Sequence, residues 1–388
     1  MKTQRLYEQD AYCREFTARV LSCDPTEGGY AAVLDATAFF PEGGGQAADT
    51  GVLDGVAVTD VQLRGDAIVH TVVAALPVGE TVTGRIDWEQ RFARMQKHTG
   101  EHIVSGLIHR LYGLHNVGFH LGREDVTLDL DGELTREQLD EIETLANRAV
   151  WEDRPVRAWF PTPEEQQTLE YRSKKAIDGP LRIVEIEGVD RCACCAPHVA
   201  HTGEIGVIRL LDFLRYKGGV RIHMQCGLDA LLDSRMHFHE VTAAAARLSV
   251  KPTELTGAVE RLLAQRDDLS RRLRQERAQA AVLLARNAPA EDVSPLFLPG
   301  EPDNAAMRQV LEALLARGIS PAGVFVGDAE RGYRFAAMGG ADLPGLARRM
   351  KEQLGSRGGG SPEIVQGQVK ATAGAIRAFW RQETENDR

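Results

Sequence analysis

Long apolar runs are absent from this sequence, and no stretch approaches the ~20 residues that a membrane-spanning helix needs. The chain opens on Met1-Lys2-Thr3-Gln4-Arg5 and continues into polar residues, so we expect no signal peptide. Cysteine is scarce, and three of the six cysteines fall within residues 192–195. Such crowding does not suit a disulfide framework and favours metal-binding thiols. We therefore expect a cytoplasmic protein without a membrane partner.

An excess of basic residues is also missing. The chain has 46 Lys and Arg against 56 Asp and Glu, a net charge of −10. This balance argues against a general nucleic-acid coat protein, and we expect no DNA partner. Two local basic stretches, residues 215–221 and residues 261–286, could still bind a phosphate backbone. The second stretch fits a solvated helix face equally well.

The chain contains 388 residues, a length that suggests two or three domains. Short apolar runs separated by turns predict a small barrel or sandwich in residues 16–90, and the apolar period becomes helical near Trp88. We predict an α+β fold class. The expected domains are a β-barrel-like domain with a glycine motif at 1–90, an α+β domain with the candidate metal-binding residues at 91–235, a helical arm at 236–290, and a small α/β domain at 291–388.

The predicted helical arm contains an apolar pattern with alternating spacings of three and four residues. Its members are Leu255, Val259, Leu262, Leu269, Leu273, Ala280 and Leu283. Arg266 and Glu276 interrupt the pattern. A short coiled coil and a helix packed on its own domain fit equally well. A homodimer through this arm or through the C-terminal domain is one expected assembly.

Two pairs of metal-binding residues lie nearly a hundred positions apart. His98 and His102 are four residues apart on a predicted helix, so both side chains lie on one face. Cys194 and His198 have the same spacing, but Pro197 disfavours a helix there. Three imidazoles and one thiolate suit one tetrahedral Zn²⁺ ion.

The sequence leaves open which cysteine supplies the thiolate ligand. Cys192, Cys194 and Cys195 all lie close together, and the four-residue spacing to His198 favours Cys194. Cys195 would then be a neighbour with a packing role.

Residues 98–102 also spell His-x-x-Glu-His, the inverted zinc-peptidase signature. In that hypothesis Glu101 activates water at the metal. It leaves the Cys194 and His198 pair unexplained, and it finds no obvious glutamate as a third ligand.

Three consecutive glycines, Gly43, Gly44 and Gly45, precede Gln46. Glycine allows positive φ and a close backbone approach to a ligand, and successive N–H groups can bind an anion. A wide hairpin turn is the alternative.

The motifs together resemble a known family. The segments that carry the likeness are residues 39–46, His98-x-x-x-His102, Cys194-x-x-x-His198 and residues 202–206. In this order they resemble the editing domain of alanyl-tRNA synthetase, and more closely its free-standing relatives, the AlaX alanyl-tRNA editing proteins. Residues 357–362 with residues 366–367 resemble the DHH-associated C-terminal domain of that synthetase. The likeness covers nearly the whole chain.

The resemblance implies hydrolysis of the ester in tRNA(Ala) mischarged with serine, and also with glycine. It implies one zinc ion on His98, His102, Cys194 and His198. Gly43, Gly44, Gly45 and Gln46 would line the pocket and face the aminoacyl end. The family has Cys-Gly-Gly-Thr-His where this chain has residues 194–198, so contacts in the pocket differ. The family's tail is expected to serve dimer contacts or to touch the tRNA elbow.

Two residues are candidates for catalysis, Thr37 from the chemistry of editing and Glu101 from the His-x-x-Glu-His motif. An apolar synthetic pocket cannot strongly reject serine, whereas a second site that hydrogen-bonds the hydroxyl can reject alanine. Thr37 is the candidate partner for that hydroxyl, and Glu101 is the candidate catalytic carboxylate. A non-catalytic tRNA-binding protein with a structural zinc remains the third hypothesis.

Overall fold

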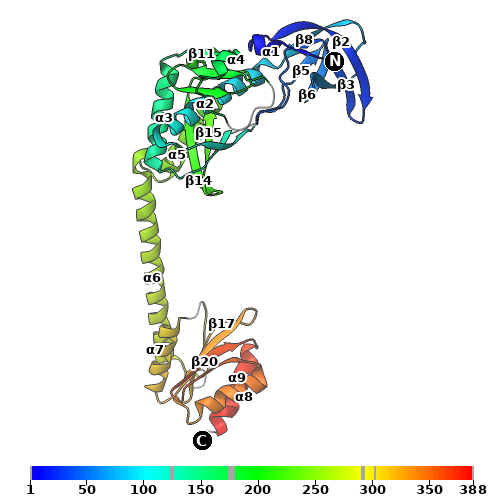
Figure 1. Cartoon of the computed structure of the whole chain (residues 1–388). Coiled ribbons are helices and arrows are strands. Elements are labelled where there is room, and N and C mark those ends of the chain that lie inside the picture. The colour runs from blue at the N-terminus through cyan, green and yellow to red at the C-terminus, as the bar shows by residue number, and fades with distance from the viewer. Residues whose placement is uncertain (1, 123–125, 174–179, 290–292, 301–302, 387–388) are drawn as a thin grey trace. The chain divides into compact units, whose positions relative to one another are not determined.

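The computed structural model describes residues 2–122, 126–173, 180–289, 293–300 and 303–386, and it has a mixed α+β fold (Figure 1). The chain divides into two compact units, Met1–Ala243 and Ala244–Arg388. The α+β class predicted from the sequence is confirmed. Within the described residues, the helices are all too short or too polar to cross a membrane.

Six strands in the first unit pair in a ring. Their order is β2 (Glu15–Thr26), β3 (Gly29–Leu34), β7 (Ala67–Val72), β6 (Val56–Arg64), β5 (Gly51–Leu53) and β8 (Thr81–Ile86), and β8 pairs back to β2. Alternate side chains point inward, so Val20, Leu34 and Ile68 are buried in the interior. Outside the ring, β1 (Gln4–Arg5) pairs with β4 (Ala36–Thr37), and α1 (Leu6–Gln9) follows β1.

The helix α2 (Trp88–Tyr112) follows the barrel directly. The Asp87 side chain caps its first turn by accepting from Gln90 N–H, and Gly113 ends it in the left-handed conformation. Most of its second half is buried, so its polar residues face protein on several sides. This burial lets α2 carry site residues inside the fold.

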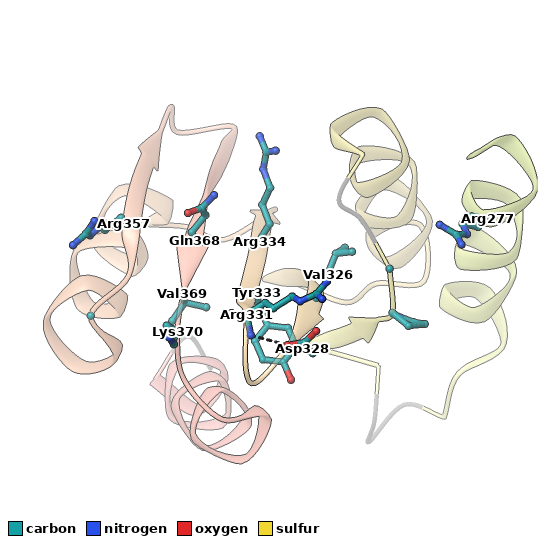
Figure 2. A pocket seen from close by; sticks show the side chains of 15 residues that line it. Arg277, Val326, Asp328, Arg331, Tyr333, Arg334, Arg357, Gln368, Val369 and Lys370 are labelled. Atoms are coloured by element: carbon teal, nitrogen blue, oxygen red, sulfur yellow. Dashed lines mark hydrogen bonds between the residues drawn. The ribbon is translucent and has the colours of Figure 1, made fainter. Parts of the chain in front are cut away.

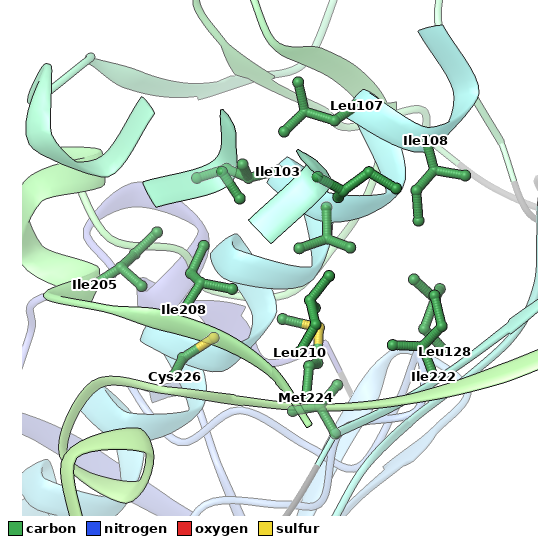
Figure 3. Packing of buried hydrophobic residues seen from close by; sticks show 14 of the residues in the cluster. Ile103, Leu107, Ile108, Leu128, Ile205, Ile208, Leu210, Ile222, Met224 and Cys226 are labelled. Carbon is green, nitrogen blue, oxygen red and sulfur yellow. The ribbon is translucent and has the colours of Figure 1, made fainter. Parts of the chain in front are cut away.

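Two sheets and several helices surround α2. One sheet has the order β14 (Ile208–Tyr216), β15 (Gly219–Cys226), β10 (Val126–Leu130) and β9 (Asn116–Leu121). The other contains β11 (Val156–Trp159), β12 (Ile183–Ile186) and β13 (Asp190–Ala193). The remaining elements are α3 (Arg136–Trp151), α4 (Pro163–Gln166), the 3₁₀ turn η1 (Thr202–Ile205) and α5 (Gly227–Arg247). Figure 3 shows Ile103 and Leu107 of α2 among apolar side chains of β14 and β15.

The second unit begins with a long helix. After the turn η2 (Pro252–Glu254), α6 (Leu255–Asn287) runs for 33 residues. A sheet follows in the order β16 (Leu296–Leu298), β17 (Ala322–Asp328), β18 (Gly332–Met338), β20 (Ile364–Val369) and β19 (Arg357–Gly360). Its helices are α7 (Asn304–Leu315), α8 (Leu343–Leu354) and α9 (Ala373–Asn386). Two apolar clusters pack around this sheet, and one of them includes the end of α6.

A buried ion pair joins the barrel to α2. Asp49 and Arg91 are both inaccessible to solvent, and Asp49 Oδ2 accepts from Arg91 Nε at 2.8 Å and also from its Nη2. Arg91 donates further bonds to the carbonyls of Ala38 and Ala11, and Asp49 accepts from Phe40 N–H. These bonds satisfy two charges that could not otherwise be buried.

Replacing Asp49 with Ala is expected to lower the free energy of unfolding by about 3–5 kcal/mol, because it leaves a buried guanidinium without its counter-ion. Urea denaturation followed by circular dichroism measures this change. The control is Glu15→Ala, which removes an exposed pair with Arg85 and should cost less than about 1 kcal/mol. Equal losses in the two variants would contradict the structural role of the buried pair.

Candidate metal centre

Four side chains with metal-binding atoms converge in the first unit. His98 and His102 lie on α2, whereas Cys194 and His198 lie in the non-helical segment after β13. One donor atom from each residue lies within 4.8 Å of the other three. The three histidines are buried, and Cys194 is partly buried. The structure thus brings together the two pairs that the sequence places far apart.

The distances in this cluster fit a tetrahedral ion. Cys194 Sγ lies 3.5 Å from His98 Nε2 and 3.4 Å from His198 Nε2. Zinc bonds of about 2.3 Å to sulfur and about 2.0–2.1 Å to nitrogen put these atoms about 3.5 Å apart at a tetrahedral angle. The donor set and its spacing therefore suit zinc.

Each imidazole has a second contact that holds its other nitrogen. His98 Nδ1 lies 2.9 Å from Gln46 Oε1, and His198 Nδ1 lies 3.0 Å from Thr99 Oγ1. His102 Nδ1 lies 3.2 Å from Asp190 Oδ2. A contact at Nδ1 fixes the ring and leaves Nε2 for a metal, which is the usual arrangement at histidine-metal sites.

Asp190 is itself held in place. It accepts from Arg172 Nε at 2.7 Å and from Arg172 Nη2 at 2.9 Å, and Arg172 Nη2 also donates to Ser105 Oγ. Burial by itself raises the pKa of Asp190, but hydrogen bonds from His102 and Arg172 outweigh it and lower the pKa to about 2. Asp190 is therefore a carboxylate at neutral pH and orients His102.

The Cys194 thiol is largely shielded from water, between two imidazoles and the apolar cluster of the barrel. Burial raises its pKa to about 12, and the neighbouring Cys195 acts in the same direction. A metal cation next to the sulfur would favour the thiolate, which is the form of cysteine that ligates a metal.

The competing cysteines have different surroundings. Cys192 is buried on β13 and forms a second possible group with His102 and Asp190, but Asp190 is already bonded by Arg172. Cys195 is exposed. The group that contains Cys194 has the better zinc chemistry, because all its donors are nitrogen or sulfur.

The three glycines form a tight turn that delivers Gln46 to this cluster. Gly43 and Gln46 exchange both backbone hydrogen bonds at 3.0 Å, while Gly44 and Gly45 have φ of 62° and 84°. A Cβ on Gly45 would lie 2.7 Å from Phe119 O, so only glycine allows the turn to dock on β9. The N–H groups of Gly43 and Gln46 are used within the turn.

The two candidate catalytic residues have partners of their own. Thr37 is buried at the barrel, where its Oγ1 lies 2.9 Å from His70 Nε2 and accepts from Phe39 N–H. Burial lowers the pKa of His70 to about 4, so this contact is between neutral groups. Glu101 is fully buried and accepts from Asn116 Nδ2 at 2.6 Å. Neither residue belongs to the group of four donors.

Sequence reasoning missed the residues that orient the imidazoles. The sequence does not point to Thr99 or Asp190, nor to the contact of Gln46 with His98. The positions of Thr99 beside His98 and of Asp190 just before the cysteine cluster were the available signals. Their contacts depend on tertiary packing.

A cationic cleft lies in the second unit (Figure 2). It has a volume of about 880 Å³, and five basic side chains line it: Arg277, Arg331, Arg334, Arg357 and Lys370. The acidic side chain in its wall, Asp328, accepts from the backbone N–H groups of Glu330 and Arg331. A smaller cleft of about 510 Å³ shares Arg277 and Arg334 and adds Arg274. This concentration of positive charge, in a chain of net charge −10, suits a polyanion.

Comparison with known proteins gives two family matches. Residues 15–90 match the class II (A) tRNA synthetases, and residues 181–223 match the second additional domain of threonyl- and alanyl-tRNA synthetases. Alanine–tRNA ligases of Ignicoccus hospitalis and Pyrococcus abyssi are 32% and 34% identical over 92% and 97% of this chain. The mouse alanyl-tRNA editing protein Aarsd1 is 35% identical over 53% of the chain.

The matched models describe parts of aminoacyl-tRNA synthetases, and this is the wider class to which the chain is related. More narrowly, the chain is similar over most of its length to parts of alanine–tRNA ligases and over about half of its length to an alanyl-tRNA editing protein. It spans 40% and 43% of the length of the two ligases and 54% of the mouse editing protein.

Replacing Cys194 with Ala is expected to abolish stoichiometric zinc binding, because it removes one of four donors from a buried site. Metal analysis of purified protein after dialysis against a weak chelator measures the zinc content. Cys195→Ala is the matched control and should retain about one zinc per chain. Full zinc retention by the Cys194 variant would rule out this ligand set.

Proposed function

We propose that this protein is a cytoplasmic trans-editing hydrolase that deacylates tRNA(Ala) mischarged with serine or glycine. In this proposal His98, His102, Cys194 and His198 hold one zinc ion. The observation that carries the proposal is the convergence of these four donors beside the glycine turn, whose Gln46 contacts His98. The similarity to relatives named alanyl-tRNA editing proteins supports it.

The proposed chemistry requires mainly positioning, because an aminoacyl ester is already reactive toward water. Gln46, Asp190 and Thr99 orient the three imidazoles, and the docked glycine turn forms one wall of the site. When bound, zinc would supply positive charge and a cross-link between α2 and the segment after β13. Four protein donors normally complete a tetrahedral shell, so shaping the pocket is the role that best suits this donor number.

Thr37 and Glu101 stay in the proposal as the candidate catalytic residues, Thr37 as partner for the serine hydroxyl and Glu101 as a carboxylate. The Thr37 hydroxyl contacts His70, and the Glu101 carboxylate accepts from Asn116. These contacts support the packing around the barrel and around α2. Discrimination of serine from alanine would then depend on groups that line the pocket beside the glycine turn.

The inverted-motif peptidase is the weaker hypothesis. It requires Glu101 to direct a water molecule at the metal. Glu101 instead accepts a 2.6 Å hydrogen bond inside the fold, and Cys194 and His198 complete the donor set. These contacts favour the deacylase over the peptidase.

The partners that we propose are tRNA(Ala) and a second copy of the chain. The cationic cleft of the second unit would bind the phosphate backbone of tRNA, since its five basic side chains match a polyanion. The tail resembles a domain that is expected either to serve dimer contacts or to touch the tRNA elbow, and the second of these roles agrees with this assignment.

Purified protein is expected to release serine from Ser-tRNA(Ala) and to leave Ala-tRNA(Ala) largely intact. A timed acid-precipitation assay with radiolabelled amino acid measures both reactions. Cys194→Ala should slow serine release by roughly 100-fold or more, because the pocket loses its ordered wall, whereas Cys195→Ala should retain activity. Serine release no faster than in buffer, from zinc-loaded wild-type protein, would refute the deacylase.

Binding of tRNA is expected to weaken steeply with salt. The slope of log K against log salt concentration is negative, and each phosphate contact that is lost should reduce its magnitude by roughly 0.7–0.9. Filter binding of Arg334→Ala and Arg357→Ala between low and high salt tests this. Arg308→Ala, which removes an exposed pair with Glu312 on α7, is the control and should leave the slope unchanged. A salt-independent affinity would argue against an RNA partner.

A further inference from the structure

Arg182 is a buried cation that lies just before β12. It is only 6% exposed, and the described residues give its side chain carbonyl partners rather than a carboxylate. Its Nε is buried and has no hydrogen-bond partner among those residues. Burying a charge with an unmade hydrogen bond is unfavourable, and an apolar side chain would avoid this cost. The contacts that Arg182 does make therefore have to offset it.

Those contacts go to the ligand loop, residues 194–198, which carries two of the four metal-binding donors. The loop is neither helix nor strand, so its backbone groups need partners elsewhere. Arg182 Nη1 donates to Cys194 O at 3.0 Å and to Ala196 O at 2.9 Å. The carbonyl of Arg182 also accepts from Cys194 N–H at 3.0 Å. Three backbone groups in the first half of the ligand loop are thus bonded to one residue.

Both side-chain bonds come from the same nitrogen of Arg182. The carbonyls of Cys194 and Ala196 therefore converge on one point, which fixes the turn between them. The Ala196 N–H in this turn donates a hydrogen bond to the Cys194 sulfur. In this turn, Cys194 Sγ lies within 3.5 Å of the Nε2 atoms of both His98 and His198. The geometry of the donor set therefore depends on the shape of the loop.

The thiol needs a different kind of support from the imidazoles. Each histidine ring is held at its own Nδ1, by Gln46, Thr99 or Asp190. A cysteine side chain has a single donor atom, and that atom must face the metal. Its direction can be fixed only through its backbone and through N–H groups beside the sulfur. Arg182 supplies the backbone contacts.

We propose that Arg182 is a positioning residue for the metal centre, which fixes the ligand loop so that Cys194 completes the donor set and thereby strengthens zinc binding. The inference rests on the metal ligands named under the proposed function, and it adds a residue that supplies no donor atom. A guanidinium also repels a metal cation, so positioning has to exceed this repulsion. The direction in which zinc affinity changes separates the two effects.

Replacing Arg182 with Met in the full-length chain removes both side-chain bonds and leaves an apolar side chain. The zinc dissociation constant, measured by competition with a chromophoric chelator, should rise by roughly 10- to 100-fold, the usual effect of losing a contact that orients a metal ligand. Arg182→Lys should lose less than about tenfold, because an ammonium group has three donors and can serve both carbonyls.

Arg191→Met is the matched control. It removes an arginine of β13 that pairs with Glu185, and it should bind zinc like wild type. Urea denaturation of the metal-free variants checks that Arg182→Met still folds cooperatively. The absorption of Co²⁺-loaded protein provides a second reading, because the thiolate-to-metal band should weaken in Arg182→Met and persist in Arg182→Lys.

Zinc binding by Arg182→Met as tight as in wild type, or tighter, would overturn the proposal. Equal losses in the Met and Lys variants would also overturn it, since they would show that a hydrogen-bond donor is not what the loop requires. A wild type that binds no zinc would overturn the metal centre together with this role. Zinc-loaded wild type that releases no serine would count against the deacylase alone, because metal affinity is measured without substrate.

Discussion

The architecture of the candidate metal centre depends on fixing three imidazole rings at their outer nitrogens. A histidine presents one nitrogen to an ion reliably only when the other nitrogen is held. Gln46, Thr99 and Asp190 do this here, and they come from the glycine turn, from α2 and from β13. The site is therefore assembled from three separate segments, and each segment must be positioned before the four donors can converge.

The barrel region contributes directly to the candidate site. The glycine turn docks on β9 because Gly45 has no Cβ, and this docking brings Gln46 to His98. The buried pair of Asp49 and Arg91 joins the same region to α2, only two helical turns before His98. Displacing the barrel from α2 would thus disturb the orientation of a ligand as well as the stability of the fold.

The second unit combines two surfaces of opposite character. The cleft beside β18 and β19 gathers basic side chains, whereas α6 exposes apolar ones, among them Leu262, Leu269 and Leu273. Arg277 shows how closely the two are arranged, since it lines the cleft and follows Glu276 directly in the chain.

Sequence patterns alone determined the α+β class, the four metal-binding candidates and the interrupted heptad pattern of α6. Each depends on local periodicity or on donor chemistry, and both can be read along the chain. Tertiary structure decided which atoms meet. It put Thr37 against His70 and Glu101 against Asn116, assigned Gln46 to His98, and gathered Arg331, Arg334 and Arg357 around one cleft. The physical reason is that these contacts join segments remote in sequence, whose pairing depends on packing rather than on any local pattern.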